Sequence, residues 1–282
     1  MNSTNYNITP KFIEGNAGKL FSLHYAPQKI TDNSECFVIA PSFAEEMNRC
    51  RYMGTMLAQS LSKNGFGYLI IDTYGTGDSE GDSKDVDWNQ SCQDLKAAFE
   101  YAHTLGYSYV SLLGMRIGAL QVMQILSKLE NINRLVFWQP VINGQAALTQ
   151  FLRIKIAASI GRNEKAETIG DFERQIEQGN YLSVAGYDIS PELFKAMKEA
   201  QFLGNIETCS IPVAWFTTLT SADRKTPRSD LALIDQWRIQ GAKIDHMEII
   251  GPPFWQAHER TLIPELVDAT VKYITGNKKY GH

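Results

Sequence analysis

The chain has 282 residues, of which 44% are hydrophobic and 21% charged, a composition typical of a globular protein with a large core. Its formal net charge is -4 and no long run of Lys or Arg occurs, which argues against nucleic acid or an anionic membrane as a partner. The polar N-terminus and the lack of a long apolar stretch predict a cytoplasmic protein without a membrane span.

Strand-like and helix-like segments alternate along most of the sequence, which is the pattern of a mostly parallel α/β sheet with helices on both faces. The first two strands, residues 11–15 and 19–25, are expected to form a hairpin through a short turn at 16–18. The other predicted strands are residues 36–40, 67–72, 109–113, 135–138, 213–217 and 244–250, and the helices between and after them are 52–63, 91–105, 119–129, 229–240 and 263–274.

The pattern changes between residues 144 and 204, where amphipathic helices are expected without a convincing strand. The sequence therefore predicts one domain in two parts, a core of residues 1–143 and 205–282 and a helical cap inserted at 144–204. The four cysteines are scattered without ligand spacing, so neither a metal site, nor another cofactor, nor a disulfide framework is expected.

A sharp strand-to-helix turn is predicted at Gly114-Met115-Arg116-Ile117-Gly118, which follows an apolar strand and opens a helix. The G-x-X-x-G pattern in this context is typical of a nucleophile elbow, in which two glycines permit a strained turn that lifts the central residue. A plain tight turn is the alternative interpretation. A second motif, Asp72 followed by G-x-G-x-S within residues 73–79, also begins at the end of a predicted strand, the edge where open α/β sheets bind ligands.

Together the two motifs resemble the α/β-hydrolase superfamily. The resemblance implies an α/β-hydrolase fold, with a mostly parallel sheet of about eight strands, flanking helices and a helical cap. Nearly the whole chain is also similar to one subgroup, the second hydrolase associated with the exosortase A and exopolysaccharide system of Gram-negative bacteria, whose elbow also carries arginine. That similarity rests on residues 41–48, 74–82, 114–119, 138–141, 185–187 and 251–255.

Arg116 stands where the superfamily has its nucleophilic serine, and a guanidinium is permanently protonated and has no nucleophilic lone pair. The base position after the last strand, residues 251–255, contains no histidine. His258 follows a few residues later, where a surface role is the alternative to catalysis. Asp223 has the D-x-x-x-P spacing of the catalytic acid, although it could equally be a turn aspartate. Ordinary serine-hydrolase chemistry is therefore not expected.

The loop after the third strand, where the superfamily places its oxyanion hole, contains Ser42, Phe43, Glu45 and Glu46. Two carboxylates would oppose the stabilisation of a developing negative charge. Three working parts thus depart from the superfamily together, which favours a changed task. We expect Arg116, at a helix N-terminus, either to recognise an anionic group or to pair with Glu45 or Glu46, since an unpaired buried guanidinium is costly.

The leading hypothesis is a protein, hydrolytic by resemblance, that binds or acts on a small anionic or acyl/ester ligand linked to the exosortase system. One alternative is a non-catalytic binding or scaffold protein. Another is a hydrolase or acyltransferase that uses carboxylate-activated water or another hydroxyl, a route that an adjacent guanidinium opposes. The oligomeric state is left open. The candidate catalytic residues are Arg116, Glu45, Glu46 and Asp223, and the candidate binding residues, of which the aromatic ones could instead be core, are Ser42, Phe43, Met115, Trp138, Gln139, Phe254, Trp255 and His258.

Overall fold

The main sheet of the protein has eight strands, in the spatial order β1-β2-β4-β3-β5-β6-β9-β10. The computed structural model describes residues 6–161, 167–202, 211–257 and 259–276. Strand β2 runs antiparallel to both of its neighbours, β1 and β4, and the other neighbouring pairs are parallel. The strands are β1 (Asn7–Glu14), β2 (Lys19–Ala26), β3 (Glu35–Ala40), β4 (Gly67–Ile71), β5 (Tyr109–Met115), β6 (Ile132–Trp138), β9 (Val213–Leu219) and β10 (Ile244–Ile250).

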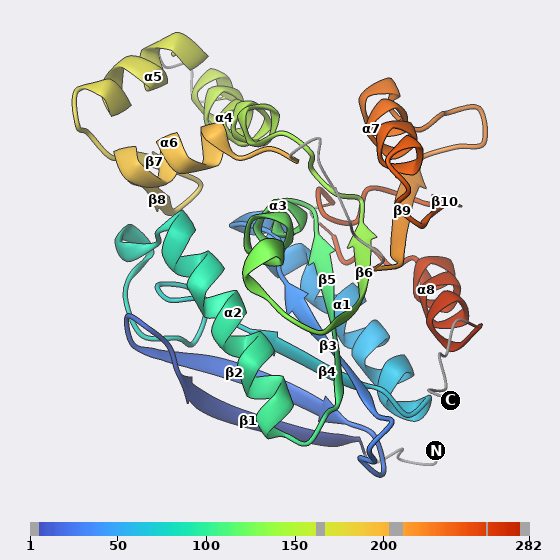
Figure 1. Ribbon diagram of the computed structural model, residues 1–282. Helices are drawn as coiled ribbons and strands as arrows, with labels where there is room; N and C mark the ends of the chain where they lie inside the picture. Colours follow the sequence, from blue (N-terminus) through green and yellow to red (C-terminus); the bar gives the residue numbers. More distant parts are fainter. Residues whose placement is uncertain (1–5, 162–166, 203–210, 258, 277–282) are drawn as a thin grey trace.

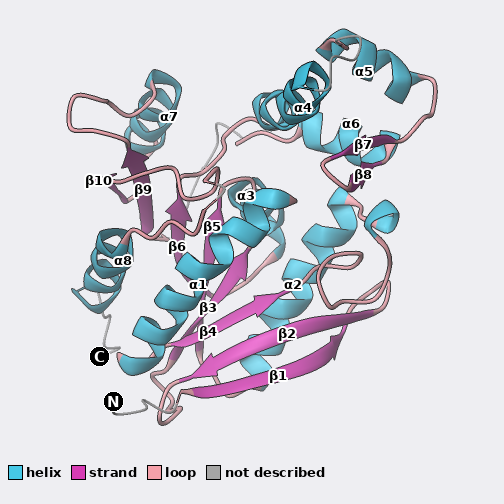
Figure 2. Ribbon diagram, turned by 180° about the vertical axis from the view of Figure 1, so that it is seen from behind, coloured by secondary structure: helices cyan, strands magenta, loops and turns pink. Residues whose placement is uncertain are grey.

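Helices cover both faces of this sheet (Figures 1 and 2). The apolar residues of α1 (Glu45–Lys63) and α8 (Pro264–Gly276) form one core with the sheet face that they cover. Those of α2 (Trp88–Thr104), α3 (Gly118–Ile125) and α7 (Arg228–Ile239) form the core on the opposite face. None of the described helices is long and apolar enough to cross a membrane.

The core strands are short apolar runs, and all six residues of β3 are buried. In a parallel sheet, strands that are buried on both faces are expected to have such nearly continuous apolar sequences. Helix α1 begins earlier than the predicted 52–63. The prediction missed its first turns because they are mostly polar and show no apolar periodicity. The predicted helix at 119–129 ends at Ile125 and continues as a short 3₁₀ turn, η2 (Leu126–Lys128).

In its described part, the segment between β6 and β9 contains three helices, α4 (Gly144–Gly161), α5 (Ile169–Glu177) and α6 (Pro191–Glu199). Figure 1 shows them beyond the tips of β5 and β6. The expectation of no strand in this segment is wrong, because β7 (Leu182–Val184) and β8 (Tyr187–Ile189) form a small antiparallel hairpin. Each strand has three residues, joined by Ala185 and Gly186 at positive φ, and strands this short give no recognisable alternation.

The parallel strands β3, β5, β6, β9 and β10 all end at the same edge of the sheet. The loops after β3, β5, β6 and β10 therefore meet there, close to the helices of the inserted segment (Figure 2). Ligands bind at this carboxyl edge in open α/β sheets.

Candidate functional site

The turn between β5 and α3 has the geometry of an elbow. Arg116 has φ of 53°, a left-handed conformation that is uncommon for a residue other than glycine. A Cβ at Gly118 would lie 2.3 Å from the carbonyl oxygen of Ala40, and one at Gly114 would lie 2.6 Å from Cα of Ala119. The two glycines therefore let strand, helix and the neighbouring loop approach closely. The predicted sharp turn is present, with Arg116 at its apex.

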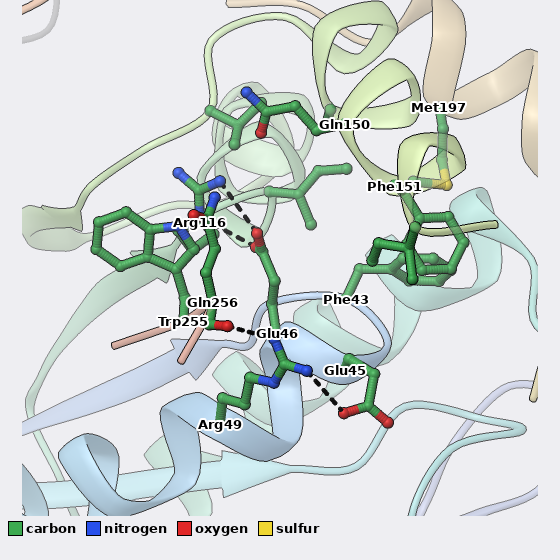
Figure 3. A pocket seen from close by; sticks show the side chains of 14 residues that line it. Phe43, Glu45, Glu46, Arg49, Arg116, Gln150, Phe151, Met197, Trp255 and Gln256 are labelled. Atoms are coloured by element: carbon green, nitrogen blue, oxygen red, sulfur yellow. Dashed lines mark hydrogen bonds and ion pairs between the residues drawn. The ribbon is translucent and has the colours of Figure 1, made fainter. Parts of the chain in front are cut away.

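The Arg116 side chain is 8% exposed and is held by partners from three other segments. Its Nε donates to Oε2 of Glu46 at 3.0 Å and its Nη2 donates to Oε1 at 3.1 Å, which is the bidentate geometry of a strong ion pair. Its Nη1 donates to the carbonyl oxygen of Gln139 at 3.2 Å. The guanidinium also lies over the Trp255 ring, 4.8 Å from its centroid. Of the two expectations for Arg116, the structure contains the pair with Glu46 (Figure 3).

A second pair of opposite charges lies beside the first one. Nη2 of Arg49 lies 3.7 Å from Oε2 of Glu45, and Nη1 of Arg49 donates to the carbonyl oxygen of Gln256 at 2.8 Å. The Tyr187 hydroxyl donates to Oε1 of Glu45 at 3.4 Å and accepts from Nδ2 of Asn48 at 2.9 Å. Burial, followed by the charge of Glu45, raises the pKa of the Tyr187 phenol. This tyrosine thus connects the β7–β8 hairpin to the start of α1.

These side chains border a cavity of about 290 Å³ at the carboxyl edge of the sheet. Much of its wall is apolar and comes both from the sheet loops and from the inserted helices, including Phe43, Ile117, Val141, Phe151, Met197 and Trp255. The charged residues on its border are the paired Glu46 and Arg116, and Glu45 and Arg49 (Figure 3). The cavity is therefore an apolar space whose bordering charges compensate one another.

Four of the expected binding residues lie deeper in the protein. Ser42 is buried and its hydroxyl donates to Sγ of Cys50 at 3.3 Å. Ser42 and Met115 border a separate, smaller cavity of about 90 Å³. The Trp138 indole donates to Oγ1 of Thr270 at 2.9 Å, and Phe254 packs against its ring. Met115, Trp138 and Phe254 belong to the core between the sheet and helices α1 and α8.

The Cys50 thiol is a potential nucleophile near the elbow, but its environment keeps it protonated. Burial raises its pKa to about 12. Since the thiolate is the reactive form of cysteine, Cys50 is an unreactive core residue at neutral pH. The described residues that border the larger cavity include no serine, histidine or cysteine.

The remaining expected residues have different fates. Gln139, with φ of 43°, holds Arg116 in position. Its backbone carbonyl oxygen accepts a hydrogen bond from Arg116, and its Oε1 accepts one from the Thr218 amide. Asp223 is exposed in the loop after β9, where the Ser221 hydroxyl lowers its pKa, and it does not border the cavity. His258 lies outside the described residues. Among the described residues, no group of His, Cys, Asp and Glu side chains could hold a metal ion.

The structure adds several residues to the site that the sequence analysis did not single out. Phe151 and Met197 come from the inserted helices and reach the cavity only through the tertiary fold. Arg49 had a detectable signal, because it lies four residues after Glu45 on one helix, the spacing at which opposite charges pair. Asp230 is a buried carboxylate in the first turn of α7; burial raises its pKa, and the nearby Arg116 charge opposes that shift.

The eight-stranded sheet with its antiparallel second strand, the elbow after β5 and the helical insertion after β6 together define the α/β-hydrolase fold. Residues 32–181, more than half of the chain, match the Hydrolase_4 family, described as serine aminopeptidase, S33, and the chain belongs to this family. No curated protein matches the sequence. The fold prediction is confirmed, whereas the exosortase association stays a prediction from the quoted motifs.

Solved structures show the same fold at low sequence identity. Est1E from Butyrivibrio proteoclasticus, solved with ferulic acid bound, is 19% identical, with a TM-score of 0.66 over 95% of this chain and 98% of its own. The α/β hydrolase GrgF from Penicillium sp. sh18 is 13% identical, with a TM-score of 0.64 over 97% and 99%. Mouse α/β hydrolase domain-containing protein 10 is 12% identical, with a TM-score of 0.58 over 95% and 97%.

Proposed function

We propose that this protein binds a small, uncharged acyl or ester compound in the cavity beside Arg116, without forming an acyl-serine intermediate. The observation that carries the proposal is the bidentate pair between Arg116 and Glu46 at the position of the nucleophile. A guanidinium cannot attack a carbonyl carbon. The fold therefore keeps the place where its relatives present a nucleophile, and fills it with a hydrogen-bond donor.

The charges around the cavity favour an uncharged ligand. An anion that approached Arg116 would compete with Glu46 and would also meet the carboxylate of Glu45. Removing one member of a buried ion pair from its partner leaves an uncompensated charge, which costs several kcal/mol. A cation would meet the same difficulty at Arg116 and Arg49. The acyl or ester class of ligand thus fits the site better than the anionic class.

Arg116 can hold an acyl group by hydrogen bonding. Its guanidinium has five N–H donors, and three of them bind Glu46 and Gln139. A carbonyl oxygen of a ligand is an acceptor for either of the other two. The apolar walls, among them Val141, Phe151 and Met197, would surround the acyl chain, as in small-molecule sites where a few polar groups orient a mostly apolar ligand.

A hydrolase that activates water with a carboxylate has less support. Both oxygens of Glu46 accept hydrogen bonds from Arg116, and Glu45 interacts with Arg49 and Tyr187. Each carboxylate therefore already has a positively charged partner, and a base that activates water is better served by an unpaired carboxylate. The scaffold or binding alternative is compatible with the proposed site. A connection with exopolysaccharide or exosortase systems would add the biological setting of the ligand and rests on the motif resemblance alone.

The proposal is tested with octanoylglycerol, an uncharged acyl ester, by isothermal titration calorimetry and by assay for released octanoate. We expect saturable binding without turnover, and no labelling by a fluorophosphonate probe. Ala147→Trp, which places an indole in the cavity wall on α4, is expected to weaken binding by about tenfold or more, since the apolar area available to the ligand is lost.

Ala222→Trp is the matched control, because Ala222 is exposed in the loop after β9 and does not border the cavity. It should bind octanoylglycerol like the wild type. Equal affinities of wild type and Ala147→Trp would contradict the assignment of the cavity. Labelling of one serine by the fluorophosphonate would contradict the absence of a nucleophile.

A further inference from the structure

A second cavity of about 290 Å³ lies on the other side of Phe43 from the one beside Arg116. It is enclosed by the start of α1, the loop after β4, the 3₁₀ turn η1 (Ser83–Asp85) and the β7–β8 hairpin. Phe43 borders both cavities. Its side chain is therefore a divider between two spaces of similar size.

The divider consists of two aromatic rings from different parts of the chain. Phe43 lies in the loop between β3 and α1, and Phe151 lies on α4 in the inserted segment. Their ring centroids are 5.5 Å apart with an interplanar angle of 70°, an edge-to-face contact. Both rings are only partly buried, and Figure 3 shows them side by side at the edge of the first cavity. Among the described residues, Phe43 is the one that borders both cavities, so its side chain is the group whose position decides whether the two spaces connect.

Most of the surface of the second cavity is apolar, although Asn48, Thr76, Ser83, Tyr187 and Asp188 also border it. Its lining includes Phe43, Met47 and Val86, and methionine adapts readily to the shape of a ligand. Gly75 and Gly77 add backbone without side chains. Its polar side chains bond mostly to each other, since Asn48 donates to Tyr187 at 2.9 Å and Ser83 donates to Asp188 at 3.4 Å. These features suit the methylene chain of a ligand better than a polar head.

We propose that the two cavities are compartments of one elongated site, which binds a long-chain acyl ester whose chain passes Phe43 into the second cavity. This inference rests on the proposed function and narrows its ligand to long chains. Size supports it, because each cavity alone lies just below the roughly 300–1,000 Å³ typical of ligand sites, whereas both together fall well inside that range. The ester carbonyl would remain beside Arg116.

Octanoylglycerol and tetradecanoylglycerol, each below its critical micelle concentration, distinguish the two compartments by calorimetry. The wild type should bind tetradecanoylglycerol at least about tenfold more tightly, because every further buried methylene adds roughly a factor of three to four. Ser83→Trp, which places an indole in the second cavity, should abolish this difference and leave octanoylglycerol affinity unchanged. Ser108→Trp adds the same ring at an exposed position before β5, at the opposite edge of the sheet, and should keep the difference.

Phe43→Ala gives a second, independent readout, since it removes the divider. The Phe43→Ala variant should retain the preference for tetradecanoylglycerol, and this measurement does not depend on whether Ser83→Trp folds. Equal affinities of the two esters in the wild type, or a preference that survives in folded Ser83→Trp, would overturn the two-compartment site while leaving the first cavity in place. If neither ester bound at all, the proposed function would be overturned, and this inference with it.

Discussion

Arg116 and Glu46 approach each other from the N-terminal ends of two helices. Glu46 lies in the first turn of α1, where the helix dipole favours a carboxylate, whereas Arg116 precedes α3, where the dipole disfavours a cation. The bidentate pair therefore compensates both the buried charge of Arg116 and its unfavourable position. The Trp255 ring and the Gln139 carbonyl oxygen contribute further electrostatic stabilisation.

Removing the Glu46 charge should reveal this dependence. We expect Glu46→Gln to lower the free energy of unfolding by about 2 kcal/mol, less than the roughly 3–5 kcal/mol of a fully buried pair, because the Glu46 side chain is 29% exposed. The variant should also gain affinity for octanoate, since the guanidinium would lack its anionic partner. Urea unfolding and calorimetry with octanoate measure the two effects.

Glu45→Gln is the matched control for the neighbouring position. Its partner Arg49 lies 3.7 Å away, and the two side chains are 36% and 22% exposed. Exposed pairs of this kind contribute less than about 1 kcal/mol, so the variant should unfold almost like the wild type and gain no affinity for octanoate. Equal destabilisation by both substitutions would show that the Arg116–Glu46 pair contributes no more to the free energy of unfolding than the exposed Arg49–Glu45 pair.

The sequence predicted the residues at the apex of the site better than those in its walls. Arg116, Glu46 and Trp255 lie together because they follow the carboxyl ends of three parallel strands, and the alternation of strands and helices predicts that such strands end at one edge of the sheet. The sequence could not show that the Trp138 side chain points into the core, because a residue at a strand end can face either side of the sheet.

At the scale of elements, the turn between β5 and α3 depends on close backbone approach. A methyl group at Gly118 would meet two carbonyl oxygens, those of Ala40 and Pro41, at 2.3 Å and 2.5 Å. Backbone atoms cannot move aside as a flexible side chain would. We expect Gly118→Ala to lower the free energy of unfolding by about 1–3 kcal/mol, the usual cost of overpacking, measured by urea unfolding.

Gly170→Ala tests whether the effect comes from packing. In α5, the nearest atom to an added Cβ at Gly170 is Oγ1 of Thr168 at 3.8 Å, an ordinary contact distance. Alanine is favoured over glycine in helices by up to about 1 kcal/mol, so this variant should be neutral or more stable. A neutral Gly118→Ala would refute the tight turn.

Element prediction succeeded where a segment is either fully buried or buries one continuous face. The buried strand β5 and the amphipathic α2 both carry strong periodic or apolar signals. It missed the β7–β8 hairpin, whose position is fixed by tertiary contacts instead, among them the hydrogen bond between Tyr187 and Asn48. The part of the site contributed by the inserted segment was consequently the part that the sequence did not define.

On the scale of the whole molecule, the Arg116–Glu46 pair at the carboxyl edge of the sheet has a counterpart, Arg134 with Glu35, at the opposite edge. At the amino edge, Nη2 of Arg134 on β6 donates to Oε2 of Glu35 on β3 at 2.9 Å, and the Ser111 hydroxyl on β5 donates to the same carboxylate. Arg134 also donates to the carbonyl oxygen of Ile274 on α8. Both charged side chains are at most 6% exposed. This pair joins three strands and a helix, and neither residue borders the two cavities of the proposed site.

The two pairs allow stability and ligand binding to be separated. Glu35→Gln leaves a fully buried guanidinium without its counter-charge, so we expect it to lower the free energy of unfolding by about 3–5 kcal/mol, more than Glu46→Gln. Its affinity for octanoylglycerol should match that of the wild type, measured by calorimetry at a temperature where the variant is folded. Glu46→Gln should instead alter that affinity, because Glu46 borders the cavity and holds Arg116 in place. If Glu35→Gln impaired binding as strongly as Glu46→Gln, general loosening of the sheet would explain both results, and the carboxyl-edge pair would have no distinct part in recognition.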